Sequence, residues 1–127
     1  MKIDFNNALA FRTFYSKIKD QKFPLRTGYR LNCIIKALEP HISFYQESIT
    51  NIINEFAEKD ENGKIIPDEN GNFKIPTEYI EICNTKITEL LNFEIEIDVK
   101  QLSIDELENI EVGMEDLVGI SPFITEE

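Results

Sequence analysis

The segment from Leu25 to Lys59 carries the pattern that most constrains how this chain folds. Its apolar residues recur in alternating steps of four and three, at Leu31, Ile35, Leu38, Ile42, Tyr45, Ile49, Ile52 and Phe56. This spacing predicts one long amphipathic helix with a continuous apolar stripe. Pro40 lies inside the segment, where it lacks an amide donor and crowds the preceding turn. Because the stripe keeps its register across Pro40, we predict a kink rather than a break.

A second helix is predicted over residues 77–92, directly after Pro76. Thr77 is its expected N-cap. One face of this helix is apolar and consists of Tyr79, Ile80, Cys83, Ile87, Leu90 and Leu91. We expect this face to pack against the long helix as a hairpin within one chain. A homomeric coiled coil is the alternative, but the bulky Tyr45 and Phe56 fit regular two-stranded packing poorly.

Two segments near the ends of the sequence read as strands. The stretches "MKIDF" at 1–5 and "FEIEIDV" at 93–99 alternate apolar and polar residues, which is typical of half-buried strands. A short helix is expected after the first strand, with Asn6 and Asn7 at its cap, and another after Ser103, which forms a capping box with Glu106. We therefore predict one α+β domain over residues 1–127, in which the long kinked helix and the second helix form a hairpin packed with a small antiparallel β-sheet.

The sequence Asp-Glu-Asn-Gly occurs twice, at 60–63 and at 68–71. A calcium-binding loop starting at Asp68 would need Gly where Phe73 stands, and one starting at Asp60 would place Lys64 at a ligand position. We therefore predict turns instead of a metal site. Asn-Gly is the dipeptide that type I′ hairpin turns favour, so residues 58–76 are expected to form a small β-excursion between the two helices.

The sequence offers little for catalysis or metal binding. His41 is its only histidine, and neither a phosphate-binding loop nor a nucleophile-elbow motif occurs. Cys33 and Cys83 form no metal-binding pair; we expect buried thiols, with a disulfide between the helices as the alternative. We predict that the protein is not an enzyme, with no catalytic residue, no metal and no cofactor.

Charge is distributed unevenly along the chain, whose net charge is −11. Residues 1–36 hold eight Lys or Arg and two Asp, whereas residues 91–127 hold one Lys and eleven acidic residues. An acidic protein is repelled by phosphate backbones, so nucleic acid is an unlikely partner. The candidate basic patch is Arg26, Arg30 and Lys36, which either contact a phosphate or form an ordinary solvated face. No apolar run is long enough to span a membrane.

The C-terminal segment, residues 112–127, is unusually apolar for so acidic a context. Its candidate partner-binding residues are Leu117, Val118, Ile120, Phe123 and Ile124. These side chains either cap the core of the protein itself or form a docking segment for another protein.

Four stretches of the sequence stand out together: "NEFAEKDENGKII" at the end of the long helix, "DENGNFKIP", "ELLNFEIEID" and the tail "MEDLVGISPFI". With them the chain resembles a family of small phage and prophage proteins of unknown function from Gram-positive hosts. The resemblance implies a viral origin, with a role in the infected cell or in virion assembly. We expect an accessory protein that binds a phage or host protein, in the host cytoplasm or associated with the virion, as a monomer or a dimer. A virion or tail assembly role is the first hypothesis, and an acidic inhibitor of a host defence or nucleic-acid enzyme is the second.

Overall fold

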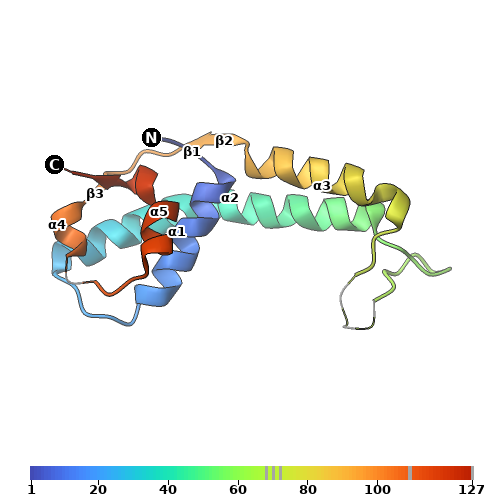
Figure 1. Ribbon diagram of the computed structural model, residues 1–127, viewed down its shortest axis with the longest axis horizontal. Coiled ribbons are helices and arrows are strands. Elements are labelled where there is room, and N and C mark those ends of the chain that lie inside the picture. Colours follow the sequence, from blue (N-terminus) through green and yellow to red (C-terminus); the bar gives the residue numbers. More distant parts are fainter. Residues whose placement is uncertain (68, 70, 72, 109, 127) are drawn as a thin grey trace. The chain divides into compact units, whose positions relative to one another are not determined.

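A computed structural model describes residues 1–67, 69, 71, 73–108 and 110–126 (Figure 1). Contacts divide the chain into two compact units, which are described separately. The first unit comprises Met1–Ser43 and Phe93–Glu127, and the second comprises Phe44–Asn92. Helices and short strands occur together, so the predicted α+β class is confirmed. The assignment of the whole chain to a single domain stays a prediction.

The helices are α1 (Phe5–Ile18), α2 (Leu25–Phe56), α3 (Thr77–Leu91), α4 (Ile104–Leu107) and α5 (Met114–Gly119). The strands are β1 (Lys2–Asp4), β2 (Glu94–Glu96), β3 (Leu102–Ser103) and β4 (Ile124–Thr125), and a 3₁₀ turn, η1, covers Ser121–Phe123. The long helix α2 has 32 residues and runs unbroken through Pro40, as the register of its apolar stripe predicts.

The core of the first unit lies between α1, the N-terminal part of α2 and the C-terminal tail. Helix α1 buries one face, formed by Phe5, Ala8, Phe11, Phe14 and Ile18. Helix α2 buries Thr27, Leu31, Ile34, Leu38 and Ile42. Ile34 is fully buried, whereas Ile35 of the heptad stripe is half-buried.

Helix α1 begins one residue before the predicted cap. Asp4, not Asn6 or Asn7, is the N-cap: its Oδ1 accepts a hydrogen bond from the Asn7 amide at 2.9 Å. In return, Asn7 Oδ1 accepts from the Asp4 amide at 3.1 Å. This reciprocal pair satisfies two backbone donors at the point where β1 ends, so strand and helix follow each other without a loop.

Strands β1 and β2 pair antiparallel, with Ile3 opposite Ile95, which confirms the small antiparallel sheet. The terminal ammonium group of Met1 extends the pairing by donating to the carbonyl oxygen of Ile97 at 3.0 Å. A second pair was not predicted: β3 and β4 run parallel, with Leu102 opposite Ile124. Each of these strands has two residues, too few for alternation to be recognisable in the sequence.

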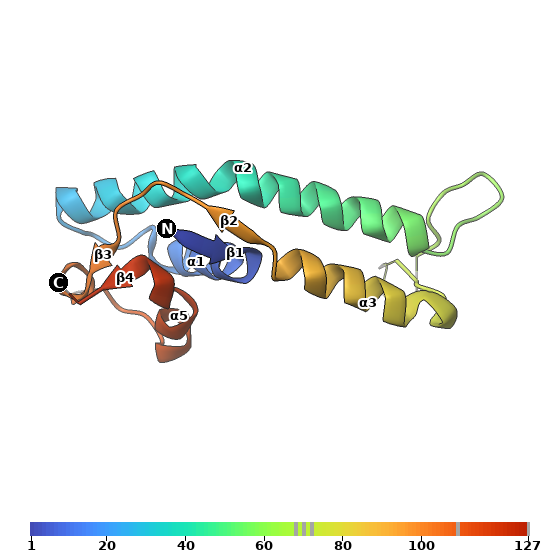
Figure 2. The same ribbon diagram turned by 90° about the horizontal axis from the view of Figure 1, so that it is seen from above.

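The second unit contains the predicted helical hairpin. The C-terminal part of α2 lies antiparallel to α3, as Figure 2 shows. The rings of Phe56 and Tyr79 have centroids 5.7 Å apart, and Lys86 Nζ lies 3.6 Å from the Glu55 carboxylate and 5.1 Å from the Phe56 ring centroid. The N-cap of α3 is Pro76, and no side-chain cap bond forms among the described residues, so the assignment of Thr77 was wrong.

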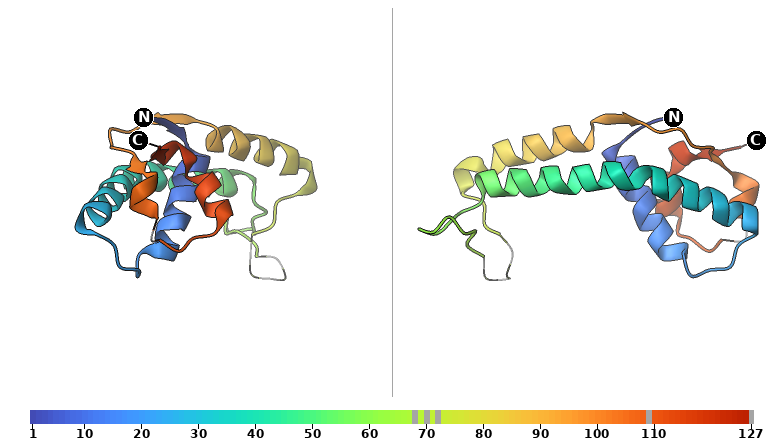
Figure 3. Two further views of the ribbon diagram at one scale, coloured as in Figure 1. Left: turned by 60° about the vertical axis from the view of Figure 1, so that its left-hand side comes forward. Right: turned by 180° about the vertical axis from the view of Figure 1, so that it is seen from behind.

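The segment between α2 and α3 makes turns but no regular strand among its described residues. Isolated bridges join Lys59 to Ile65 and Pro67 to Phe73, and Figure 3 shows the loop between Lys59 and Ile65 beyond the end of α2. Gly63 has a φ of 79°, whereas no described non-glycine residue has a positive φ, so Asn62 does not form the predicted type I′ turn. Asp60 Oδ1 instead accepts from the amides of Asn62 and Lys64, which fixes a type I turn followed by a left-handed glycine. Asn70 of the second motif lies outside the described residues.

The two cysteines are free thiols, Cys83 buried in the second unit and Cys33 half-buried in the first. The alternative of a disulfide between the helices is therefore wrong. The buried Cys83 behaves as a small apolar residue.

Replacing Phe123 with Ala should destabilise the protein strongly. Phe123 is fully buried and its ring centroid lies 4.8 Å from that of Phe11, so truncation removes a large core side chain and leaves a cavity. We expect a loss of about 3–5 kcal/mol in the free energy of unfolding, measured by urea denaturation. Val118→Ala is the control: its side chain is 70% exposed, and a change within about 0.5 kcal/mol is expected. Equal effects of the two substitutions would contradict the assignment of Phe123 to the core.

Backbone amides of α3 should exchange with solvent faster than those of α1. Among the described residues of the second unit, Ala57 and Cys83 alone are buried, whereas α1 buries five of its own residues. Local opening of a helix costs less free energy when the opening exposes less apolar surface to water. Hydrogen–deuterium exchange followed by mass spectrometry measures this directly, and equal protection of the two helices would contradict it.

Candidate functional site

A pocket in the first unit is the main candidate for binding another protein. It has a volume of about 420 Å³ and lies between α4, the turn after α4, α5 and β4. Six aliphatic residues and one glutamate line it: Ile104, Leu107, Glu108, Ile110, Val112, Leu117 and Ile124. The volume is within the range of natural ligand pockets. We call it the C-terminal pocket.

One wall of the C-terminal pocket is held in place by a capping box and an ion pair. Ser103 Oγ accepts from the Glu106 amide at 3.3 Å and starts α4. Glu106 Oε1 also accepts from the guanidinium of Arg30 on α2, with both side chains largely buried. The second oxygen, Glu106 Oε2, is buried without a hydrogen-bond partner among the described residues. The positively charged guanidinium of Arg30 stabilises this buried carboxylate.

The opposite wall is fixed to α1, which lies beside α5 in Figure 1. Lys17 Nζ donates to both carboxylate oxygens of Asp116, at 3.0 and 3.1 Å. Gly119 packs so closely that a Cβ atom there would lie 3.1 Å from the Ala10 Cβ. Both contacts hold α5 along α1, and this position turns Leu117 toward the C-terminal pocket.

The segment between α4 and α5 is tied to the end of α1. Gln21 Nε2 donates to the carbonyl oxygen of Glu111 at 3.0 Å, and the Glu111 amide donates to Gln21 Oε1 at 3.1 Å. These two bonds hold the backbone between Ile110 and Val112, which both line the pocket. The C-terminal pocket is therefore built into the folded unit and does not depend on a free tail.

The five predicted C-terminal residues fall into three groups: lining the pocket, buried in the core, and exposed. Leu117 and Ile124 line the C-terminal pocket, whereas Ile120 and Phe123 are fully buried in the core. The position of these two side chains agrees with the capping alternative, and a docking role for the segment stays a prediction. Val118 is exposed, and it is not among the described residues that line the pocket.

The other wall of the pocket escaped the sequence-based prediction. Ile104 and Leu107 are spaced by three, which places both on one side of α4, and Ile110 follows in the turn after α4. This signal was present in the sequence, but it spans too few residues to distinguish a site from ordinary packing.

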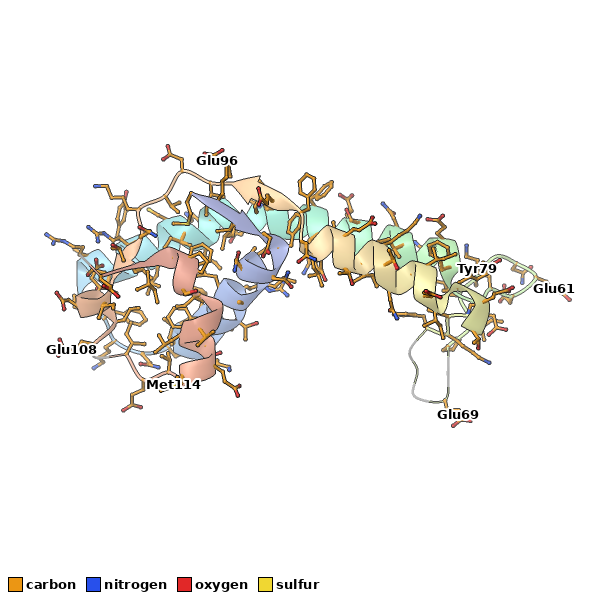
Figure 4. The ribbon with its side chains drawn as sticks, turned by 45° about the horizontal axis from the view of Figure 1, so that its top comes forward. Glu61, Glu69, Tyr79, Glu96, Glu108 and Met114 are labelled. Atoms are coloured by element: carbon orange, nitrogen blue, oxygen red, sulfur yellow. The ribbon has the colours of Figure 1, made fainter. Side chains whose placement is uncertain are left out.

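Negative charge surrounds the C-terminal pocket. Residues 101–127 hold eight acidic residues and no Lys or Arg. Glu108 lines the pocket, and Asp105, Glu111 and Glu115 are exposed. Figure 4 shows Glu108 and Met114 pointing outward at the edge of this unit. Lys17 and Arg30 pair with Asp116 and Glu106, and Lys22 and Arg26 share a neighbouring cavity with Asp105 and Ile110. Glu108, Glu111 and Glu115 are exposed carboxylates that do not line that cavity.

The predicted basic patch is only partly brought together. Arg26 and Arg30 line a second cavity of about 470 Å³, together with Tyr29, Cys33 and residues 98–100. Lys36, also on α2, is not among the described residues that line it, and a patch formed by Arg26, Arg30 and Lys36 together stays a prediction. Lys100 supplies the third cation instead, from a segment distant in the sequence. We call this cavity the cationic cleft.

The side chains of the cationic cleft differ in how they are paired. Within the described part of the chain, Arg30 is bound to Glu106, while neither Arg26 nor Lys100 forms an ion pair. A side-chain hydrogen bond with Cys33, together with the Coulomb interaction with the same group, raises the pKa of Tyr29 above its usual value. The Tyr29 phenol therefore stays protonated throughout the physiological pH range.

Comparison of the chain with protein-family models, curated proteins and solved structures returns no match in any of the three. The membership of the phage family thus stays a prediction. The described residues contain no group of three or more His, Cys, Asp or Glu placed to hold a metal ion. Among the helices of the described chain, none is long and apolar enough to cross a membrane.

Replacing Glu106 with Ala should lower stability more than replacing its neighbour Glu108. The first change removes the capping box and leaves the partly buried Arg30 without its partner. We expect a loss of about 1–3 kcal/mol in the free energy of unfolding, measured by urea denaturation. Glu108→Ala changes an exposed carboxylate and should stay within about 0.5 kcal/mol. If Glu106→Ala left the free energy of unfolding unchanged, apolar contacts alone would be holding α4 in place.

Proposed function

We propose that this protein is a non-enzymatic binding protein whose C-terminal pocket receives an aliphatic side chain from a basic segment of another protein. The observation that carries the proposal is the combination of an aliphatic lining with exposed carboxylates on the segments that form the pocket. Neither feature alone would define a partner; together they specify its chemistry.

The aliphatic lining supports binding of an apolar side chain. Six of the seven lining residues offer no hydrogen-bonding side chain, so a polar group entering the pocket would lose its water without compensation. Ile104 is 52% exposed at the pocket and gains burial when a partner covers it. Protein interfaces commonly concentrate their binding energy on one such buried anchor.

The acidic surroundings support a basic flank on the partner. Lys or Arg beside the apolar anchor would meet exposed carboxylates such as Asp105, Glu108 and Glu111. Opposite charges at the rim accelerate association and exclude acidic competitors more than they add affinity. An amphipathic helix with Leu on one face and Lys on the other satisfies both requirements.

The resemblance to phage proteins supports a biological setting for this binding. The protein is proposed to be a phage accessory protein in the host cytoplasm, with a phage protein of virion or tail assembly as the first candidate partner. Detection of the protein in purified virions would support this setting, and its absence from virions would argue against it.

A second candidate function is inhibition of a host defence or nucleic-acid enzyme. Glu94 and Glu96 of β2 and Asp105, Glu108, Glu111 and Glu115 carry exposed carboxylates, which resemble a phosphate backbone in the sign of their charge. Binding to a host nuclease that weakens steeply with added salt would favour this function over assembly.

A labelled amphipathic peptide of Leu and Lys tests the proposed pocket directly. Fluorescence anisotropy should show saturable binding to the full chain, and a Leu–Glu peptide should not bind. Ile104→Arg places a cation at the pocket and should weaken binding at least about tenfold. Ile82→Arg is the matched control: Ile82 lies on α3 in the other unit and is 48% exposed, so its change should stay within about twofold.

Equal losses in the two variants, or no saturable binding by the wild type, would contradict the proposal. If the peptide binds as expected, affinity capture from infected cells followed by mass spectrometry identifies the natural partner. The captured protein must be lost with Ile104→Arg and retained with Ile82→Arg.

A further inference from the structure

We propose that the cationic cleft of the first unit binds a nucleoside monophosphate. This site shares no lining residue with the C-terminal pocket among the described residues, and the inference does not rest on the function proposed above.

The cleft is bounded by a helix face and an extended segment. Arg26, Tyr29, Arg30 and Cys33 are spaced by three and four residues, which places them on one face of α2. Residues 98–100, which follow β2, form the other side. The volume of about 470 Å³ is ample for a small molecule and too confined for a protein domain.

The cations of the cleft favour a doubly charged anion. Arg30 is already paired with Glu106, whereas Arg26 and Lys100 have no ion pair among the described residues. A phosphate monoester carries close to two negative charges at neutral pH and accepts several charge-assisted hydrogen bonds. A guanidinium with a nearby ammonium matches that group better than it matches a single carboxylate.

Tyr29 supplies a flat surface for a ring. Its side chain is 68% exposed and lines the cleft, so a planar ligand can stack on it without displacing core residues. Stacking of a base on an aromatic side chain tolerates any base and adds to the binding of the phosphate. The protonated phenol also remains a hydrogen-bond donor.

Asp98 is the only acid that lines the cleft among the described residues. A carboxylate beside two cations would oppose a plain anion, but it accepts hydrogen bonds from the hydroxyl groups of a ribose. Phosphate, ribose and base together therefore account for the cations, the acid and the ring. A long nucleic acid fits less well, because the net charge of −11 repels a continuous phosphate backbone.

The test uses the full chain and AMP as the probe, followed by nuclear magnetic resonance and calorimetry. AMP should bind saturably and shift the amide resonances of residues 26–33 and 98–100. Adenosine and inorganic phosphate, each lacking one half of the ligand, should bind at least about tenfold more weakly. Arg26→Ala should weaken AMP binding at least about tenfold, because a charge-assisted hydrogen bond is lost.

Lys36→Ala is the matched control, since it removes a cation from the same helix outside the cleft; its effect should stay within about twofold. Tyr29→Phe should retain AMP binding, whereas Tyr29→Ala should weaken it, and circular dichroism confirms that each variant folds. Equal losses in Arg26→Ala and Lys36→Ala would overturn the site. Phosphate binding as tightly as AMP would overturn the nucleoside part of the ligand, and an oligonucleotide binding more tightly than AMP would overturn the monomeric ligand.

Discussion

The packing of Phe123 against Phe11 is the contact on which the rest of the first unit depends. Both rings are fully buried, with centroids 4.8 Å apart, and they join the two ends of the sequence. Once Phe123 is buried, Ile120 follows it into the core, and β4 can pair with β3. Leu117 and Ile124 flank these buried residues and remain at the surface, where they line the C-terminal pocket. The pocket is thus a consequence of how the tail closes the core.

Polar contacts then fix what apolar burial leaves undetermined. Burial is non-directional and would accept several orientations of two short helices. The Lys17–Asp116 pair sets the position of α5 on α1, and the Arg30–Glu106 pair sets that of α4 on α2. In each case, one charged residue comes from the basic N-terminal third and the other from the acidic C-terminal third. Part of the uneven charge of the sequence is therefore neutralised inside the folded unit.

Local features of this fold could be predicted from the sequence because neighbouring residues determine them. The stripe of α2, the alternation around Ile3 and Ile95, and the capping box of Ser103 are all set within a few positions. The N-cap was placed at Asn6 and Asn7 because the competing cap, Asp4, also ends a strand. The turn at Asn62 was misassigned because the Asp60 side chain, two residues earlier, bonds its amide and selects another turn.

The candidate sites were harder to predict because each joins distant segments. Leu117 and Ile124 were recognised as unusual, but the wall that faces them comes from α4. Arg26 and Arg30 were recognised as a basic pair, but Lys100 and Asp98 line the same cleft from the segment after β2, which pairs with β1. Residue spacing along one helix also suggested Lys36, which shares the charge and the helix but not the cleft. Periodicity identifies a face of a helix, and only long-range pairing decides what lies opposite that face.

The local charge at each site of the folded chain differs from the net charge of the whole chain. The net charge of −11 has the same sign as the acidic residues near the C-terminal pocket. The same unit nevertheless holds a cleft in which two cations have no ion pair among the described residues. The Arg30–Glu106 pair belongs to both regions, since Arg30 lines the cleft and Glu106 lies on the helix that carries Ile104 and Leu107. Salt at physiological concentration screens exposed charges beyond about 8 Å, so each ligand responds to the charges beside it. A protein segment with Lys and a phosphate-bearing small molecule can therefore be selected by one acidic chain.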